Sequence, residues 1–167
     1  MDKRQTSVSD PFSQQLVDQR RRRRSLTRRW AALSWSDRAL LVEATAMVTF
    51  GALAVRLLPF RRVVTLASGR GGPPSGRSDW AGAAARVAWA VRAAGRRAPF
   101  RVVCFQEGLA AHWMLRRRGA PSQLHYGAAL DRARGLSSHV WVTVGETDVV
   151  GCELAGDYRL LASFPPG

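Results

Sequence analysis

Residues 104–127 read CFQEGLAAHWMLRRRGAPSQLHYG, and residues 138–153 read SHVWVTVGETDVVGCE. The first stretch predicts a helix that begins at Cys104 and then a short strand. Its end is well marked, because the positive charges of Arg116–Arg118 suit the last turn of a helix, Gly119 can take a left-handed stop conformation and Pro121 prevents continuation. The second stretch predicts a strand with a histidine and a returning strand.

The strands are predicted from alternation and from turn residues. Ser138–Val144 has valines at 140, 142 and 144 on one face and His139, Trp141 and Thr143 on the other. We expect it to form an antiparallel sheet with three further extended segments, which are Gln123–Ala128, Val149–Leu154 and Tyr158–Phe164.

The region before Cys104 predicts helices. Ala39–Leu58 is strongly apolar, with Ser36 as the expected N-cap and Pro59 as the stop. This helix is either buried as part of the core or has a face for a partner. A membrane span is not favoured, because charged residues, Glu43 and Arg56, lie inside it.

A Gly/Pro/Ser-rich linker, residues 68–78, precedes a second helix. That helix is expected over Trp80–Ala94, with Asp79 as its cap and Gly95 as its end.

Composition limits the class of protein. The chain has 167 residues and a net charge of +14, and many of its arginines lie in the first 29 residues. We expect residues 1–32 to form a disordered basic tail and residues 33–167 to form one α+β domain, with helices over 36–100 and a helix-plus-sheet part over 101–167. Two cysteines and no apolar leader segment indicate a reducing, cytoplasmic setting.

Cys104 and His139 are the candidate catalytic residues. A thiol at a helix N-terminus meets unpaired backbone N–H groups and the positive end of the helix dipole, which favour the thiolate. A thiolate nucleophile needs a base, and His139 on a later strand can supply it. The other histidines, His112 and His125, have no ligand spacing with the cysteines, so no metal or other cofactor is expected.

From about Ser36 onward the chain resembles the leader peptidases of lasso-peptide biosynthesis, a transglutaminase-like family of cysteine proteases. The matching motifs are RLLPFRR, CFQEGLAAHWMLRRRG, LHYG, HVWV and YRLLASFP. The resemblance implies a papain-like core in which Cys104 is the nucleophile and His139 the base. It also implies removal of the leader from a ribosomally made precursor.

The third catalytic residue is where the chain departs from this family. Relatives have an aspartate about a dozen residues after the histidine, where this chain has Gly151. If residues 145–147 form a three-residue hairpin loop, His139 pairs with Glu153, which could then orient the imidazole. A two-residue loop would place Cys152 there instead. Asp148 is the alternative third residue, and a Cys–His dyad helped by a backbone carbonyl is a further possibility.

The resemblance also implies partners. The segment before Leu33 is too short and too polar for the N-terminal peptide-binding module of some relatives. The resemblance therefore implies that a separate recognition protein presents the leader, and the ring-closing cyclase is a further expected partner. Two rival functions remain open at this point. One is acyl transfer with the same Cys–His pair, and the other is nucleic-acid binding by the arginine-rich tail without catalysis. Neither nucleic acid nor stable membrane insertion is the favoured interpretation.

Overall fold

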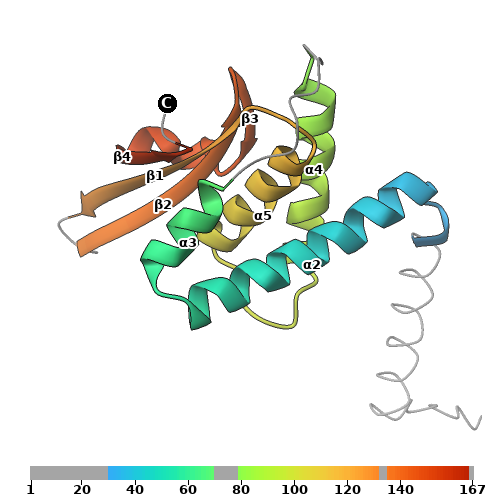
Figure 1. Cartoon of the computed structure of the whole chain (residues 1–167), viewed down its shortest axis with the longest axis horizontal. Helices are drawn as coiled ribbons and strands as arrows, with labels where there is room; N and C mark the ends of the chain where they lie inside the picture. The colour runs from blue at the N-terminus through green and yellow to red at the C-terminus, as the bar shows by residue number, and fades with distance from the viewer. Residues whose placement is uncertain (1–29, 70–78, 132–134, 166–167) are drawn as a thin grey trace, which may run out of the picture. The chain divides into compact units, whose positions relative to one another are not determined.

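A computed structural model describes residues 30–69, 79–131 and 135–165 of the chain. Residues 1–29 of the expected basic tail and residues 70–78 of the expected linker lie outside the described residues. Helices come first and strands last (Figure 1), in the order α2 (Trp35–Leu57), α3 (Phe60–Ala67), α4 (Ala81–Gly95), α5 (Cys104–Arg117), β1 (Ser122–Asp131), β2 (Gly135–Val144), β3 (Thr147–Val150), the 3-10 helix η1 (Cys152–Asp157) and β4 (Arg159–Phe164).

The four strands form one antiparallel sheet in the order β3-β2-β1-β4. The pairing of β1 with β2 runs from Ser122 opposite Val144 to Asp131 opposite Gly135, and it places Gly127 opposite His139. The α+β class expected from the sequence, with helices before a small antiparallel sheet, is confirmed.

Helix α5 is the centre of the core. It packs against α4 and against β1, β2 and β3. Leu109, Met114 and Leu115 are fully buried within it, and burial of each such side chain stabilises the fold by about 2 kcal/mol. On the facing sheet, Val140, Val142 and Val144 are buried, as the alternation along β2 predicted.

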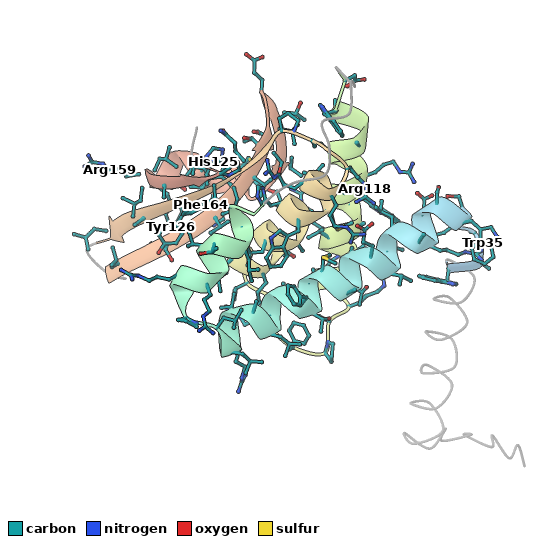
Figure 2. All side chains as sticks on the ribbon, in the orientation of Figure 1. Trp35, Arg118, His125, Tyr126, Arg159 and Phe164 are labelled. Carbon is teal, nitrogen blue, oxygen red and sulfur yellow. The ribbon has the colours of Figure 1, made fainter. Side chains whose placement is uncertain are left out.

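Helix α2 buries one face and exposes another. Gly51 on the buried face lies against α5, where a Cβ would be in ordinary contact, 3.4 Å from the main-chain oxygen of Gln106. Arg118 at the end of α5 reaches across to the Glu43 carboxylate with both of its terminal nitrogens (Figure 2). The exposed face has large apolar side chains, which are Val42, Phe50, Leu53, Val55 and Leu57.

By length and composition, α2 could cross a membrane, although 33% of its apolar 18-residue segment is buried in the fold. A core helix of a soluble protein can have the same length and composition, so these properties do not distinguish a core helix from a membrane-spanning one.

The described residues from Ala39 onward form one compact unit, and residues 30–38 belong to another. Within it, the Ser34 hydroxyl accepts a hydrogen bond from the Asp37 N–H at 3.1 Å, so Ser34 caps α2 and the expectation that Ser36 does so was wrong. The Arg38 guanidinium also donates to the main-chain oxygens of Trp30 and Ala31.

The limits of α4 and α5 lie close to where the sequence predicted them. Asp79 accepts a hydrogen bond from the Ala81 N–H at 2.9 Å, at the start of α4, and Gly95 is the last residue of that helix. Helix α5 begins at Cys104, and Gly119 beyond its end has φ = 76°. Helix α3 was not predicted from the sequence.

Candidate active site

Cys104 is the first residue of α5 and is partly exposed. Val103 before it has extended backbone (φ −109°, ψ 161°), and its N–H donates to the Gln106 side-chain oxygen at 3.2 Å. This bond fixes the direction in which the chain enters the helix. Gln106 therefore has a structural role at the helix start, and its side-chain oxygen is engaged.

The helix that begins at Cys104 packs directly on the strand that holds His139. Gly108, one turn after Cys104, lies so close to β2 that a Cβ would be 2.6 Å from Val140 Cγ1. Val140 is the neighbour of His139 in the sequence, on the opposite face of the strand. Glycine at position 108 thus brings the start of α5 and the middle of β2 into contact.

His139 is 7% exposed, and its Nε2 lies 2.7 Å from the main-chain oxygen of Gly151. The other ring nitrogen, Nδ1, has no hydrogen-bond partner among the described residues and is not sealed from solvent. One nitrogen therefore anchors the ring and the other remains available for chemistry.

Two aromatic rings lie near the imidazole of His139. The Trp141 ring stacks near it at 6.2 Å between centroids, and the Tyr158 ring lies at 5.1 Å. Gly127, opposite His139 on β1, makes room for this arrangement, since a Cβ there would lie 2.8 Å from Trp141 Cζ3. The LHYG, HVWV and YRLL motifs thus meet around a single ring.

Cys104 and His139 do not form a hydrogen bond with each other in the described part of the chain. Catalytic hydrogen bonds are often long in ligand-free enzymes and shorten when substrate binds. The structure thus brings their helix and strand together and leaves Nδ1 available.

The expected pairing of His139 with Glu153 is wrong. The hairpin loop has two residues, because Val144 pairs with Thr147, and the register then shifts so that Val142 pairs with Val150. Strand β3 ends there and η1 follows, so the expected strand Val149–Leu154 is only partly formed and neither Glu153 nor Cys152 pairs with His139.

Glu153 instead forms an ion pair with Arg92 of α4 at 2.8 Å, with the two side chains 62% and 44% exposed. Asp148, the alternative third residue, pairs with Thr143 in the sheet and makes no hydrogen bond to His139 within the described residues. The geometry therefore gives neither carboxylate the orienting position.

A group of charges that the sequence did not indicate lies beside this ion pair. Glu107, one turn after Cys104, approaches the backbone of Gly95, and partial burial raises the pKa of its carboxyl while Arg92 and Arg96 oppose that rise. Only its position in a largely apolar helix could have drawn attention to it.

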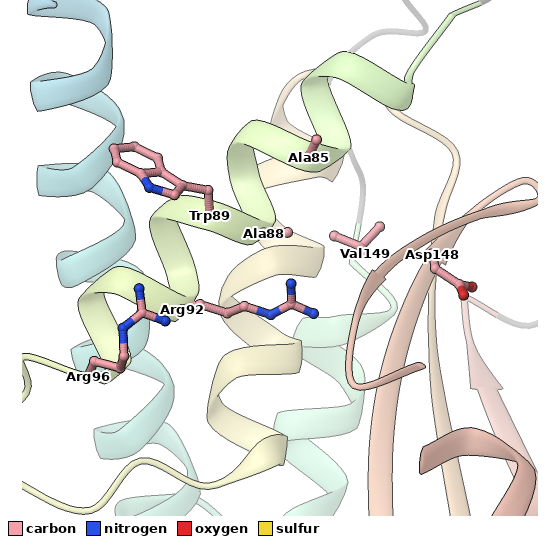
Figure 3. Close-up of a pocket in the computed structure, with 7 residues that line it drawn as sticks. All are labelled: Ala85, Ala88, Trp89, Arg92, Arg96, Asp148 and Val149. Carbon is pink, nitrogen blue, oxygen red and sulfur yellow. The ribbon is translucent and has the colours of Figure 1, made fainter. Parts of the chain in front are cut away.

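The same arginines line a pocket of about 380 Å³ between α4 and β3, together with Trp89, Asp148 and Val149 (Figure 3). The charges on its walls have both signs, so the pocket has no clear preference for an anion or a cation.

The two other histidines have structural surroundings. His125 lies between the hydroxyls of Ser163 and Thr143, at 2.8 and 3.0 Å, and ties β1 to both neighbouring strands. His112 is fully buried in α5, where its Nδ1 lies 2.7 Å from the Ser122 hydroxyl. Within the described residues, no group of three or more His, Cys, Asp or Glu side chains could hold a metal ion.

No curated protein matches the chain, and no solved structure matches it. The family described as the transglutaminase-like superfamily matches residues 44–163, well over half of the chain. This range contains the helix led by Cys104, the strand with His139 and the antiparallel sheet except for its last residue, Phe164, which together form a papain-like core. The chain therefore belongs to the transglutaminase-like superfamily.

Proposed function

We propose that the chain is a cysteine peptidase that removes the leader peptide from a ribosomally synthesised lasso precursor, which a separate recognition protein presents in the cytoplasm. Membership of the superfamily supports a cysteine protease or acyltransferase. The lasso substrate is supported by the resemblance of the motifs around Cys104 and His139 to the leader peptidases.

The proposal rests mainly on the positions of Cys104 and His139 in the fold. Cys104 opens a helix that packs on the strand of His139, and the His139 ring is anchored through Nε2 with Nδ1 available. A thiol at a helix start and an anchored imidazole on the strand that this helix packs against are the two groups that covalent catalysis needs.

The chemistry has two steps. The Cys104 thiolate attacks the scissile carbonyl, and the imidazolium of His139 gives its proton to the leaving amine. Water, deprotonated by the imidazole, then attacks the thioester, releases the acyl part as a carboxylate and restores the thiol. The N–H groups at the start of α5 are suitable donors for the oxyanion.

The test is mass spectrometry of a lasso precursor incubated with its recognition protein and with either the wild-type chain or Cys104→Ala. We expect one cut between leader and core with the wild-type chain and none with Cys104→Ala. A cut that persists in Cys104→Ala would overturn the thiol mechanism.

Acyl transfer to an amine is the second candidate, since the superfamily includes acyltransferases and the same thioester serves both reactions. Adding a primary amine to the same assay separates them. A hydrolase gives the free leader carboxylate, whereas an acyltransferase gives the amide, which differs in mass.

A further inference from the structure

The bond between His139 and Gly151 decides which ring nitrogen holds the hydrogen. The Nε2 of His139 lies 2.7 Å from the Gly151 carbonyl oxygen, and a carbonyl oxygen can only accept. Nε2 must therefore donate. In the neutral ring, the lone pair is then on Nδ1, which is the nitrogen without a partner among the described residues.

We propose that the main-chain carbonyl of Gly151 is the third member of this catalytic site. It positions His139, selects the tautomer with hydrogen on Nε2 and leaves Nδ1 to take the proton of Cys104. The part played by Nδ1 rests on the proposed function, whereas the hydrogen bond and the tautomer do not.

The position requires glycine for two reasons. Gly151 has φ = 76°, in the left-handed region that side chains disfavour. A Cβ there would also lie 2.5 Å from the Val140 oxygen and 3.2 Å from Nε2 of His139. A side-chain carboxylate at residue 151 would therefore displace the backbone, so in this fold the main chain itself supplies the acceptor.

Neighbouring contacts hold this carbonyl in place. Gly151 joins β3 to η1, and the Leu154 N–H approaches the same oxygen at 3.5 Å. The ion pair of Glu153 with Arg92 ties η1 to α4. Tyr158, directly after η1, packs its ring against His139. Glu153 thus acts on the segment that orients the imidazole and not on the imidazole itself.

A carbonyl differs from a carboxylate in one chemical respect. It accepts the same hydrogen bond but brings no negative charge next to the imidazolium. The bond therefore orients the ring without the charge stabilisation that an aspartate would add.

The direct test is the nitrogen spectrum of the full-length ¹⁵N-labelled protein. A two-bond and three-bond ¹H–¹⁵N correlation at mildly alkaline pH distinguishes protonated from bare ring nitrogens. We expect His139 to have hydrogen on Nε2 and none on Nδ1. Hydrogen on Nδ1, or averaging between the two tautomers, would overturn the proposal. His112 is the internal reference, because its Nε2 also meets a carbonyl.

A variant pair extends the test to activity. Gly151→Ala is expected to disturb the tautomer and to lower the rate of precursor cleavage by about 10- to 100-fold, because the ring loses its orientation. Gly156→Ala, in the short helix that follows Gly151, is the matched control, since a Cβ there meets nothing within 4 Å, and both readouts should stay unchanged.

Each outcome bears on a different claim. A Gly151→Ala protein that keeps both tautomer and rate would overturn the role of the carbonyl. If Gly151→Ala does not fold, the spectrum of the unsubstituted chain still decides the matter. The expected tautomer in a chain that cleaves no precursor would uphold the bond and count against the proposed function.

Discussion

His112 and His139 make the same hydrogen bond in two different surroundings. The Nε2 of His112 lies 2.9 Å from the Ala67 carbonyl oxygen, and the Nε2 of His139 lies 2.7 Å from that of Gly151. Both rings are buried, with exposed fractions of 0% and 7%. The bond to a carbonyl therefore does not distinguish a structural histidine from a catalytic one.

The two histidines differ in the surroundings of their second ring nitrogen, Nδ1. Nδ1 of His112 accepts a hydrogen bond from Ser122 at 2.7 Å, so the neutral ring is fully satisfied. Burial lowers the pKa of His112 to about 4, since no solvent stabilises the charged form. Nδ1 of His139 has no partner among the described residues and lies on the strand next to the helix of Cys104. The two residues therefore differ in whether the second ring nitrogen has a partner, and only His139 has the available nitrogen that the proposed function requires.

The largest effect is expected at His139. In His139→Gln, the amide can keep an N–H near the Gly151 carbonyl but cannot transfer a proton. Precursor cleavage should fall by about 10²- to 10⁴-fold while the melting temperature changes little, as measured by mass spectrometry and by thermal denaturation. Activity within a few-fold of wild type would show that the open nitrogen has no catalytic role.

His112→Ala should produce the opposite pattern. The Ser122 hydroxyl and the Ala67 carbonyl lose their partner and a cavity remains, so the free energy of unfolding should fall by about 3 kcal/mol in urea titrations. Ser122→Ala removes only one partner and should cost about 1–2 kcal/mol. A cleavage rate per folded molecule that collapses in either variant would contradict the structural role.

The pH dependence of stability tests the same residue. His112 binds a proton near pH 6.5 when unfolded and near pH 4 when folded, so between these values the unfolded chain holds more protons. Its contribution to stability is complete above pH 6.5 and is lost as the pH falls toward 4, by about 3 kcal/mol in total. Urea titrations over this range should show that slope in the wild-type chain, and His112→Ala should lack it.

The smallest effect is expected at Gly127, next to the Trp141 ring that stacks near His139. In Gly127→Ala, the new methyl would press on Trp141, which stacks near His139, so the cleavage rate should fall by up to about tenfold and stability by about 1–2 kcal/mol. Gly82→Ala in α4 is the control, because a Cβ there meets nothing within 4 Å. Its stability should change by less than about 1 kcal/mol. Equal cleavage rates for Gly127→Ala and Gly82→Ala would contradict the expectation that Trp141 influences the His139 ring.

The sequence by itself determined the elements whose signals are local. The limits of α5 are one example, because Arg116–Arg118 and Gly119 are residue types that favour the end of a helix. At the start of α4, Asp79 accepts a hydrogen bond from the Ala81 N–H, although the N-cap position itself is Trp80. The alternation along β2 correctly identified which valines are buried. The order of a cysteine at a helix start and a histidine on a later strand also follows from the sequence.

Only the tertiary structure decided what holds His139. Strand β3 ends at Val150 and the chain turns into η1, which takes Glu153 out of the sheet and onto Arg92. The acceptor that replaced it is a main-chain carbonyl, which every residue has and which no side-chain pattern reveals. Likewise, the partner of His112 comes from Ser122, across the turn between α5 and β1. Such contacts depend on where the backbone passes, and that is fixed only when the elements pack together.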